Sequence, residues 1–291
     1  MAAFVDHLQL LPMPFRDGVR QPDGRHRPGG LGMATLSDLL NARGWTARVE
    51  DLGFDKPMPE PRLAEAFARA IGDGVESAWE RRRFPIVLAR SPYVALGVLD
   101  ALGERTGVAW VSGSGGYRSS GLIRRPRLSQ RSLALLTGAA KRDKLAVRPA
   151  RTAGSRVVVL GAGGASVEER RAMEGDGIRL LDPGRLDRLA AEIAATDADG
   201  WYLHVDCSAL SVAAVPGADD VRPDGLDAER LADALPRAFD GRSLKAVAIV
   251  GYDMNADASG ATTGAVLALV EAAARAAGGV PRPETVGEAG G

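Results

Sequence analysis

The sequence predicts a single α/β domain, built as a doubly wound, mostly parallel sheet with helices on both faces. Short apolar runs alternate with longer helical patterns along the chain, which is typical of βαβ units. The runs are almost continuously apolar, as in VVVL and AVAIV, which indicates strands buried on both sides. No internal repeat and no linker divides the chain, so we expect residues 1–277 to form one domain.

The alternation assigns the elements in order. The predicted strands are 4–11, 45–51, 85–89, 108–112, 156–161, 178–181, 201–207 and 245–251. The predicted helices are 31–43, 61–82, 93–106, 127–138, 166–174, 184–196, 227–238 and 260–277. The segment 278–291 is rich in Gly and Pro, so we expect a disordered tail there.

Composition excludes several functional classes. Lys+Arg and Asp+Glu balance at 37 each, which gives no electrostatic basis for binding nucleic acid or an anionic membrane. No apolar run is long enough to span a bilayer, and residues 1–10 lack the pattern of a signal peptide. The single cysteine, Cys207, excludes an intramolecular disulfide and fits a reducing cytoplasm, where we expect the protein to reside.

A ligand is expected at one edge of the sheet. In open α/β sheets, ligands bind in the crevice beyond the carboxyl ends of the strands. The segments that follow the predicted strands there are 89–93, 112–125, 161–166, 204–225 and 251–260.

Residues 201–226, WYLHVDCSALSVAAVPGADDVRPDGL, carry the most specific pattern in the chain. They resemble the metal-binding strand and loop of the arginase/agmatinase (ureohydrolase) family, in which a D-x-D strand leads into L-D-P-x-x-x-P-G-x-G-x-P-x-P-G-G-L. The positions that fall in register are Asp206, Leu210, Pro216, Gly217, Pro223, Gly225 and Leu226. The family's second aspartate is replaced by Ser208. The resemblance implies an arginase-like three-layer α/β/α fold and, because family members are trimers or hexamers, a homo-oligomer.

Three further segments extend the resemblance over residues 30–277. FPIVLARSPYVALGVLDAL is similar to F-P-x-V-L-G-G-D-H-S-x-A-L-G, VAWVSGSGGYRSSG to V-x-W-x-D-A-H-x-D-x-N-T, and VAIVGYDMNADASGAT to V-V-E-x-N-P-x-x-D-x-S-G-x-T. By this alignment the remaining metal-ligand positions hold Pro92, Ser112, Ser114 and Gly116. SSGLIRRP resembles S-G-N-x-H-G, which places Arg124 where the family has a proton-shuttling histidine. The positions of the guanidinium-binding glutamate and the asparagine hold Gly251 and Asp253.

Only Asp206 remains among the six metal-ligand positions that the resemblance implies. Two Mn²⁺ ions about 3.5–4 Å apart need several carboxylates and imidazoles to hold them and to generate a hydroxide. Proline offers no donor atom at all. We therefore expect no metal, no other cofactor and no metal-dependent ureohydrolase activity.

The remaining candidates for catalysis are His204, Asp206 and Tyr117. His204, Asp206 and Ser208 share one face of a strand, and a histidine near a carboxylate is suited to acid–base chemistry. The alternative is structural: His204 is a buried, hydrogen-bonded strand residue and Asp206 a paired relic of the family's site.

A second group of residues is predicted to bind a substrate. The Ser/Gly-rich loop 112–121 can offer N–H groups and hydroxyls to an anion, and arginines near it can add bidentate contacts. The alternative is a surface loop with solvated arginines. The predicted binding residues are Arg90, Tyr93, Ser112, Ser114, Arg118, Arg124, Ser208, Tyr252 and Asp253.

Other motifs carry less weight. GAGGAS (161–166) with Asp182 imitates a dinucleotide-binding fingerprint, but Ser166 replaces its third glycine. Cys207 points away from the predicted crevice face and has no basic neighbour on its own side, so it is not expected to be a nucleophile. No His–Asp pair is evident in the sequence for a serine nucleophile.

Two functions remain open at the level of sequence. The first, which we predict from the remaining crevice residues, is a metal-independent enzyme that acts on a small organic molecule, such as a cyclase, dehydratase or isomerase of specialised metabolism. The second is a non-catalytic pseudoenzyme that senses a ligand or serves as a partner subunit. A minor third function is hydrolysis of a guanidine compound with an unusual ion.

Overall fold

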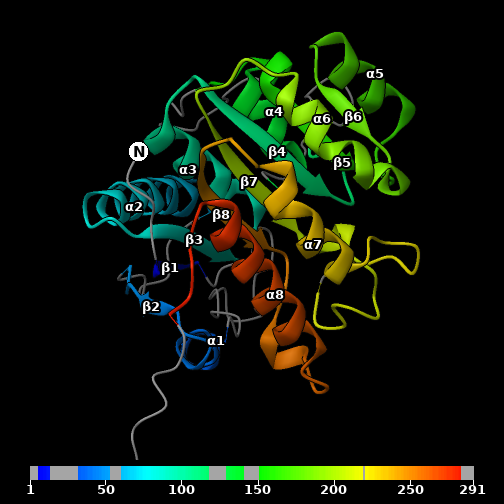
Figure 1. The fold of residues 1–291 in the computed structure, drawn as a ribbon. Coiled ribbons are helices and arrows are strands. Elements are labelled where there is room, and N and C mark those ends of the chain that lie inside the picture. Colours follow the sequence, from blue (N-terminus) through cyan, green and yellow to red (C-terminus); the bar gives the residue numbers. More distant parts are fainter. Residues whose placement is uncertain are drawn as a thin grey trace, which may run out of the picture.

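A computed structural model describes residues 6–13, 32–52, 60–117, 129–140, 151–218 and 220–282, with the backbone alone at 60–64. These residues form one eight-stranded sheet in which every neighbouring pair of strands is parallel (Figure 1). The strands are β1 (His7–Met13), β2 (Thr46–Val49), β3 (Phe84–Ala89), β4 (Thr106–Ser112), β5 (Val157–Gly161), β6 (Arg179–Leu181), β7 (Gly200–Asp206) and β8 (Leu244–Val250). Their order across the sheet is β2-β1-β3-β8-β7-β4-β5-β6.

Helices cover both faces of the sheet and complete three layers (Figure 1). The helices on one face are α1 (Met33–Ala42), α6 (Leu189–Ala194), α7 (Ala228–Ala238) and α8 (Ala261–Ala276). Those on the other face are α2 (Glu60–Glu80), α3 (Ala95–Leu102), α4 (Ser132–Thr137) and α5 (Val167–Gly175). Among the described helices, none has the length and apolar character that crossing a membrane requires.

Each central strand contributes side chains to two separate cores. On β7, Leu203 and Val205 belong to the core under α7 and α8, whereas Tyr202 belongs to the core under α2, α3 and α4. Successive side chains of a strand point to opposite faces, so a strand covered on both sides must be apolar at almost every position. This requirement explains the continuous apolar runs in the sequence.

All eight predicted strands and all eight predicted helices are present among the described residues, and the sheet is wholly parallel. The boundaries differ where local chemistry ends a helix. Helix α3 ends at Leu102 because Gly103 adopts φ 87°, and Thr106 already begins β4. The predicted helix 184–196 is a 3-10 helix, Pro183–Arg188, followed by α6.

The first residues of the expected tail are hydrogen-bonded to α8 and to the turn before β2. Gly279 donates its backbone N–H to the Ala274 carbonyl at 2.8 Å, and Arg282 donates its own to the Gly44 carbonyl at 2.8 Å. The Arg282 Nε also lies 2.6 Å from Oδ2 of Asp6, which is fully buried. Residues 279–282 therefore pack beside the start of β1; residues 283–291 lie outside the described part.

Candidate functional site

The segments that follow four neighbouring strands meet at one edge of the sheet. Strands β3, β8, β7 and β4 are adjacent, so their carboxyl ends lie side by side. The Gly251 N–H donates to the Ala89 carbonyl at 3.1 Å, which joins the end of β8 to that of β3. The Gly113 N–H donates to Ser208 Oγ at 3.2 Å, which joins the end of β4 to that of β7. At this edge the sequence predicts a ligand, and we refer to the edge as the crevice, after the position at which open α/β sheets bind ligands.

Asp206 ends β7 and begins a short 3-10 helix, Cys207–Ala209. Its Oδ1 accepts a hydrogen bond from the Ser208 N–H at 2.9 Å, which is the geometry of an N-cap. Asp206 is partly exposed, whereas Ser208 is buried. The carboxylate and the hydroxyl, predicted to act in catalysis and in substrate binding, thus both accept backbone N–H groups of the crevice.

Gly251 closes the crevice beside Asp206. Its φ of 82° lies in the left-handed region, where a side chain is strained. A Cβ at this position would stand 2.9 Å from Asp206 Oδ1. The backbone here therefore accepts glycine and excludes the glutamate that the family alignment places at this position.

His204 lies two residues before Asp206 on the same face of β7 and is fully buried. Its Nδ1 is 2.7 Å from the Tyr202 hydroxyl, and its ring stacks on Trp110 with centroids 3.7 Å apart and planes at 5°. Burial lowers the pKa of His204 to about 3, so the imidazole is neutral near pH 7. Within the described residues, Nε2 has no hydrogen-bond partner, and no bond joins the ring to Asp206.

Tyr117 is also buried, and its hydroxyl forms hydrogen bonds with residues other than Asp206. It donates to the Asp176 carboxylate and lies 3.0 Å from Thr137 Oγ1. Burial and the hydrogen bond to Asp176 both raise the pKa of the phenol. The side chain thereby connects the loop after β4 to the ends of α4 and α5.

Arg90 and Asp253 form an ion pair at the rim of the crevice, across the ends of β3 and β8. The two side chains keep 12% and 24% of their exposure, respectively. Asp253 Oδ1 also accepts the Asn255 N–H at 3.0 Å. Of the predicted binding residues, Arg90 and Asp253 are thus brought together as an ion pair.

The two tyrosines predicted to bind a substrate, Tyr93 and Tyr252, are both buried in the cores. Tyr93 stacks parallel to Phe67 of α2, with ring centroids 6.3 Å apart. Tyr252 is fully buried, which raises the pKa of its phenol, and its hydroxyl has no hydrogen-bond partner within the described residues.

The loop after β4 is described as far as Tyr117. Ser112 is buried and its Oγ accepts the Ser114 N–H at 3.3 Å, whereas Ser114 is exposed. The predicted binding residues Arg118 and Arg124 lie outside the described residues. In the GAGGAS segment, Ser166 forms a capping box with Glu169 at the start of α5.

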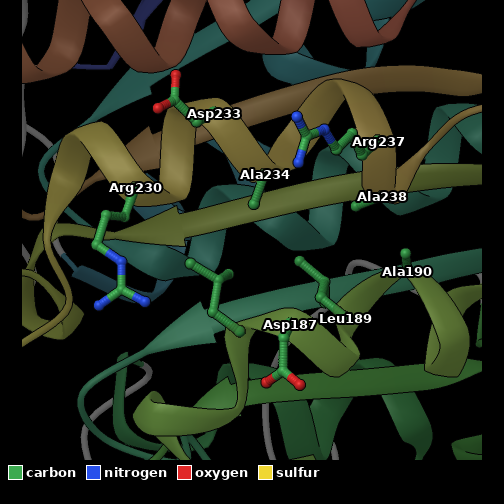
Figure 2. Close-up of a pocket in the computed structure, with 9 residues that line it drawn as sticks. Asp187, Leu189, Ala190, Arg230, Asp233, Ala234, Arg237 and Ala238 are labelled. Carbon is green, nitrogen blue, oxygen red and sulfur yellow. The ribbon is translucent and has the colours of Figure 1, made fainter.

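A second region was missed by reasoning from the sequence. A groove of about 750 Å³ runs between α7 and the 3-10 helix that leads into α6 (Figure 2). We call it the α6–α7 groove; it is lined by Leu186, Asp187, Leu189, Ala190, Arg230, Asp233, Ala234, Arg237 and Ala238. The available signal was the spacing of Arg230, Asp233 and Arg237 on α7, because positions i, i+3 and i+7 share one helix face.

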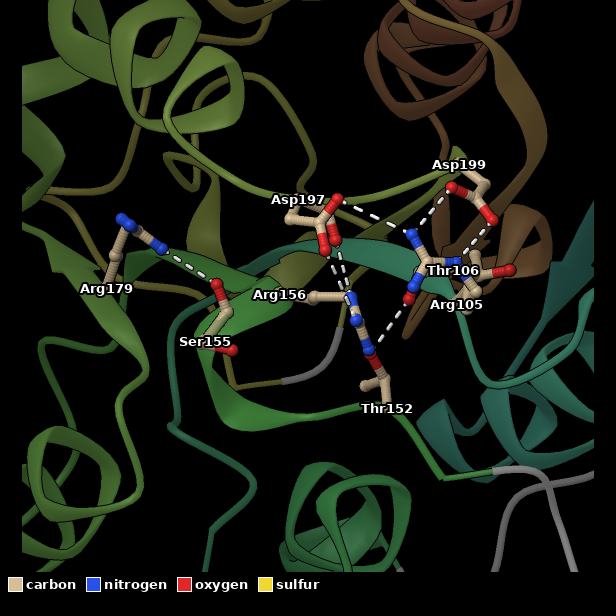
Figure 3. A network of polar contacts seen from close by, with 8 residues as sticks. All are labelled: Arg105, Thr106, Thr152, Ser155, Arg156, Arg179, Asp197 and Asp199. Carbon is tan, nitrogen blue, oxygen red and sulfur yellow. Dashed lines mark hydrogen bonds and ion pairs between the residues drawn. The ribbon is translucent and has the colours of Figure 1, made fainter.

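A polar network ties the strands together at the opposite edge of the sheet (Figure 3). Arg105, just before β4, donates through Nε to Asp199 at 2.6 Å, just before β7. Arg156 donates to the Asp197 carbonyl at 2.5 Å, and Thr152 Oγ1 to the Thr106 carbonyl at 2.8 Å. These contacts lie at the amino ends of parallel strands, away from the crevice, so they serve the fold.

Comparison with solved structures shows what this architecture is similar to. Arginase from Bacillus subtilis superposes with a TM-score of 0.75 at 20% identity, covering 92% of this chain and 98% of that one. Entamoeba histolytica arginase in complex with L-ornithine gives 0.77 at 13% identity, covering 93% and 98%. Formimidoylglutamase from Bacillus subtilis gives 0.71 at 12% identity, covering 94% and 87%. No protein-family model matches the sequence, and comparison with curated proteins finds no match.

The chain has the arginase-like α/β fold. The similarity extends over nearly the full length of these enzymes, and at identities of 20% and below it concerns the fold alone. It agrees with the resemblance seen in the sequence. In the described residues, no three His, Cys, Asp or Glu side chains gather as a metal-binding group.

Proposed function

We propose that this chain is an arginase-fold protein that carries out no metal-dependent ureohydrolysis and acts without catalysis, as a ligand sensor or partner subunit. One observation carries the proposal: the described polar side chains at the end of β7 accept backbone N–H groups of the chain itself. Ser208 Oγ accepts the Gly113 N–H, and Asp206 Oδ1 accepts the Ser208 N–H. Groups used in this way hold loops in place.

The donor set argues against a dinuclear metal centre. At the six positions that the family alignment assigns to ligands, Asp206 is the single carboxylate or imidazole. Pro92 and Gly116 offer no side-chain donor, and serine hydroxyls are weak neutral ligands. His204 does not substitute, because it is enclosed and its Nδ1 is bonded to Tyr202. The residues present therefore do not fit two divalent ions.

The acid–base groups expected from the sequence are also engaged elsewhere. His204 is neutral and stacked on Trp110, and the Tyr117 hydroxyl is bonded to Asp176 and Thr137. A general acid or base must lie within hydrogen-bond reach of the group whose proton it transfers. Buried side chains with these partners do not meet that requirement, which supports a non-catalytic role.

A second candidate function is a metal-independent enzyme acting on a small organic molecule. It is favoured by Asp206, whose carboxylate is partly exposed at the crevice. The Arg90–Asp253 pair lies at the end of β8, the strand next to β7. Asp206 would accept a proton from the substrate and return it, to another atom of the substrate in a cyclisation or isomerisation and to the leaving hydroxyl in a dehydration, while Arg90 would orient the substrate.

Metal analysis and a urea assay test the first part of the proposal. The protein is expressed and purified with Mn²⁺ supplied, analysed for bound metals, and assayed for urea release from L-arginine and agmatine. We expect far less than one ion per chain and no urea. Stoichiometric Mn²⁺ with urea release would contradict the proposal, and loss of both in Asp206→Asn would assign them to this crevice.

Metabolite profiling separates the two candidate functions. Wild-type protein and Asp206→Asn are each incubated with a desalted metabolite extract that is then followed by mass spectrometry. The non-catalytic function predicts identical profiles. Consumption of a compound by the wild type and by an Asp240→Asn control, which changes an exposed aspartate before the amino end of β8, but not by Asp206→Asn, would instead establish the enzyme.

A further inference from the structure

We infer that the α6–α7 groove is an interface between two copies of this chain, with α7 of each copy seated in the groove of the other about a twofold axis. The groove lies on the outer helix layer and shares no residue with the crevice. The inference is therefore independent of the function proposed for the crevice.

The shape of the surface suits a helix as occupant. The floor of the groove is apolar and formed mainly by small side chains, which let a helix backbone approach closely. Its apolar members are Leu186, Leu189, Ala190, Ala234 and Ala238. Figure 2 shows Ala234 directed from α7 toward the space above Leu189.

Helix α7 is at the same time a ridge. On its α8 side lies a second groove of about 400 Å³, which includes Ala232, Pro236, Ala268 and Ala272 in its lining. Asp233 lines both grooves, so it stands on the crest between them. A ridge flanked by grooves is the surface that helices use when they pack on one another.

The charges on this surface are balanced and unpaired. The α6–α7 groove carries two arginines, Arg230 and Arg237, and two aspartates, Asp187 and Asp233. Among the described residues, none of these four side chains forms an ion pair or a side-chain hydrogen bond. Arg105, by contrast, is paired with Asp199 at 2.6 Å. The groove thus keeps its charged groups available to another molecule.

The balance of charge selects a second copy as that molecule. A strongly acidic partner would meet Asp187 and Asp233, and a strongly basic one would meet Arg230 and Arg237. A twofold interface instead places residue i opposite residue j and residue j opposite residue i. With the two α7 helices antiparallel, Arg230 of each copy meets Asp233 of the other.

Sedimentation equilibrium tests the interface with a charge swap. A twofold contact predicts an even number of copies for the native chain. Arg230→Asp or Asp233→Arg alone should weaken association by about tenfold or more, because each places like charges opposite each other. The double variant Arg230→Asp/Asp233→Arg should restore association to within about threefold of native. Arg171→Asp, which changes the charge on α5 on the other face of the sheet, should leave it unchanged.

Three results would overturn the inference. A native monomer or bare trimer at every concentration would exclude the twofold contact. Native-like association of both single variants would move the interface elsewhere on the surface. Failure of the swap to restore association, with unfolding curves that match the native protein, would show that these residues do not pair across copies.

Discussion

The crevice and the α6–α7 groove use similar residues in opposite ways. In the crevice, Asp206 and Ser208 accept backbone N–H groups of their own chain. In the groove, Arg230 and Asp233 make no ion pair with any described side chain. Open α/β sheets bind ligands at this edge, yet here these two side chains serve the chain's own structure. The groups free to recognise another molecule lie on the outer helices.

The difference has an energetic consequence. Removing one partner of a buried hydrogen bond leaves the other unsatisfied and costs about 1–3 kcal/mol. Truncating an exposed, unpaired charged side chain changes stability by less than about 0.5 kcal/mol. Crevice substitutions should therefore appear as stability effects, and groove substitutions as association effects.

The largest effect is expected for Gly251→Glu. The residue adopts φ 82°, and its new Cβ would stand 2.9 Å from Asp206 Oδ1, so strain and charge repulsion add. We expect a loss of roughly 3 kcal/mol or more in the free energy of unfolding, measured by urea denaturation. Gly163→Glu is the matched control, because nothing lies within 4 Å of a Cβ there. Equal losses in the two variants would show that the crevice is not closed around Asp206.

A pH-dependent effect comes next, from His204→Phe. The folded-state pKa of His204 is about 3, below its ordinary value of 6.5, so between these values the unfolded chain binds a proton that the folded chain does not. Wild-type stability should therefore fall from about pH 6.5 to about pH 3, by up to about 1.4 kcal/mol per pH unit from this residue. His204→Phe should lack that part of the slope.

Tyr202→Phe is the control for this slope, since it keeps the imidazole and removes only the hydroxyl bonded to Nδ1. Urea denaturation at a series of pH values gives the measurement. If the wild type and His204→Phe lose stability in parallel as the pH falls, the prediction that His204 is buried and neutral in the folded protein is wrong.

The smallest effects on the free energy of unfolding are expected for two single substitutions, one in the crevice and one in the α6–α7 groove. Ser208→Ala removes the acceptor of the Gly113 N–H and should cost about 1–2 kcal/mol. Arg230→Ala removes an exposed side chain and should change stability by less than about 0.5 kcal/mol when measured at one low protein concentration. A larger loss of stability in Arg230→Ala than in Ser208→Ala would contradict the claim that crevice side chains support the fold and groove side chains do not.

The sequence predicts the sheet well because strands buried on both faces leave a continuous apolar signal. It also brings Asp206, Ser208 and Ser112 to one edge, since carboxyl ends of adjacent parallel strands coincide. It does not predict the partner of His204, because Tyr202 and Asp206 share its strand face and periodicity alone cannot choose between them.

Two other features depend on contacts between distant segments. Tyr117 bonds to Asp176, 59 positions later in the chain, and no local pattern connects them. The α6–α7 groove arises from residues 186–190 and 230–238, which meet only after the sheet has formed. Helical spacing identifies the charged face of α7, but the depth of the groove depends on the neighbouring helix.

The contact between Asp6 and Arg282 determines which circular permutants and truncations of this protein should fold. It brings the segments before β1 and after α8 to one point on the surface, with Nε and Oδ2 2.6 Å apart. A short linker between these segments would suit a circular permutant with new termini at an exposed loop. A truncation before residue 282 would instead leave the buried Asp6 carboxylate without the Arg282 guanidinium. An affinity tag should therefore follow residue 282 and not replace it.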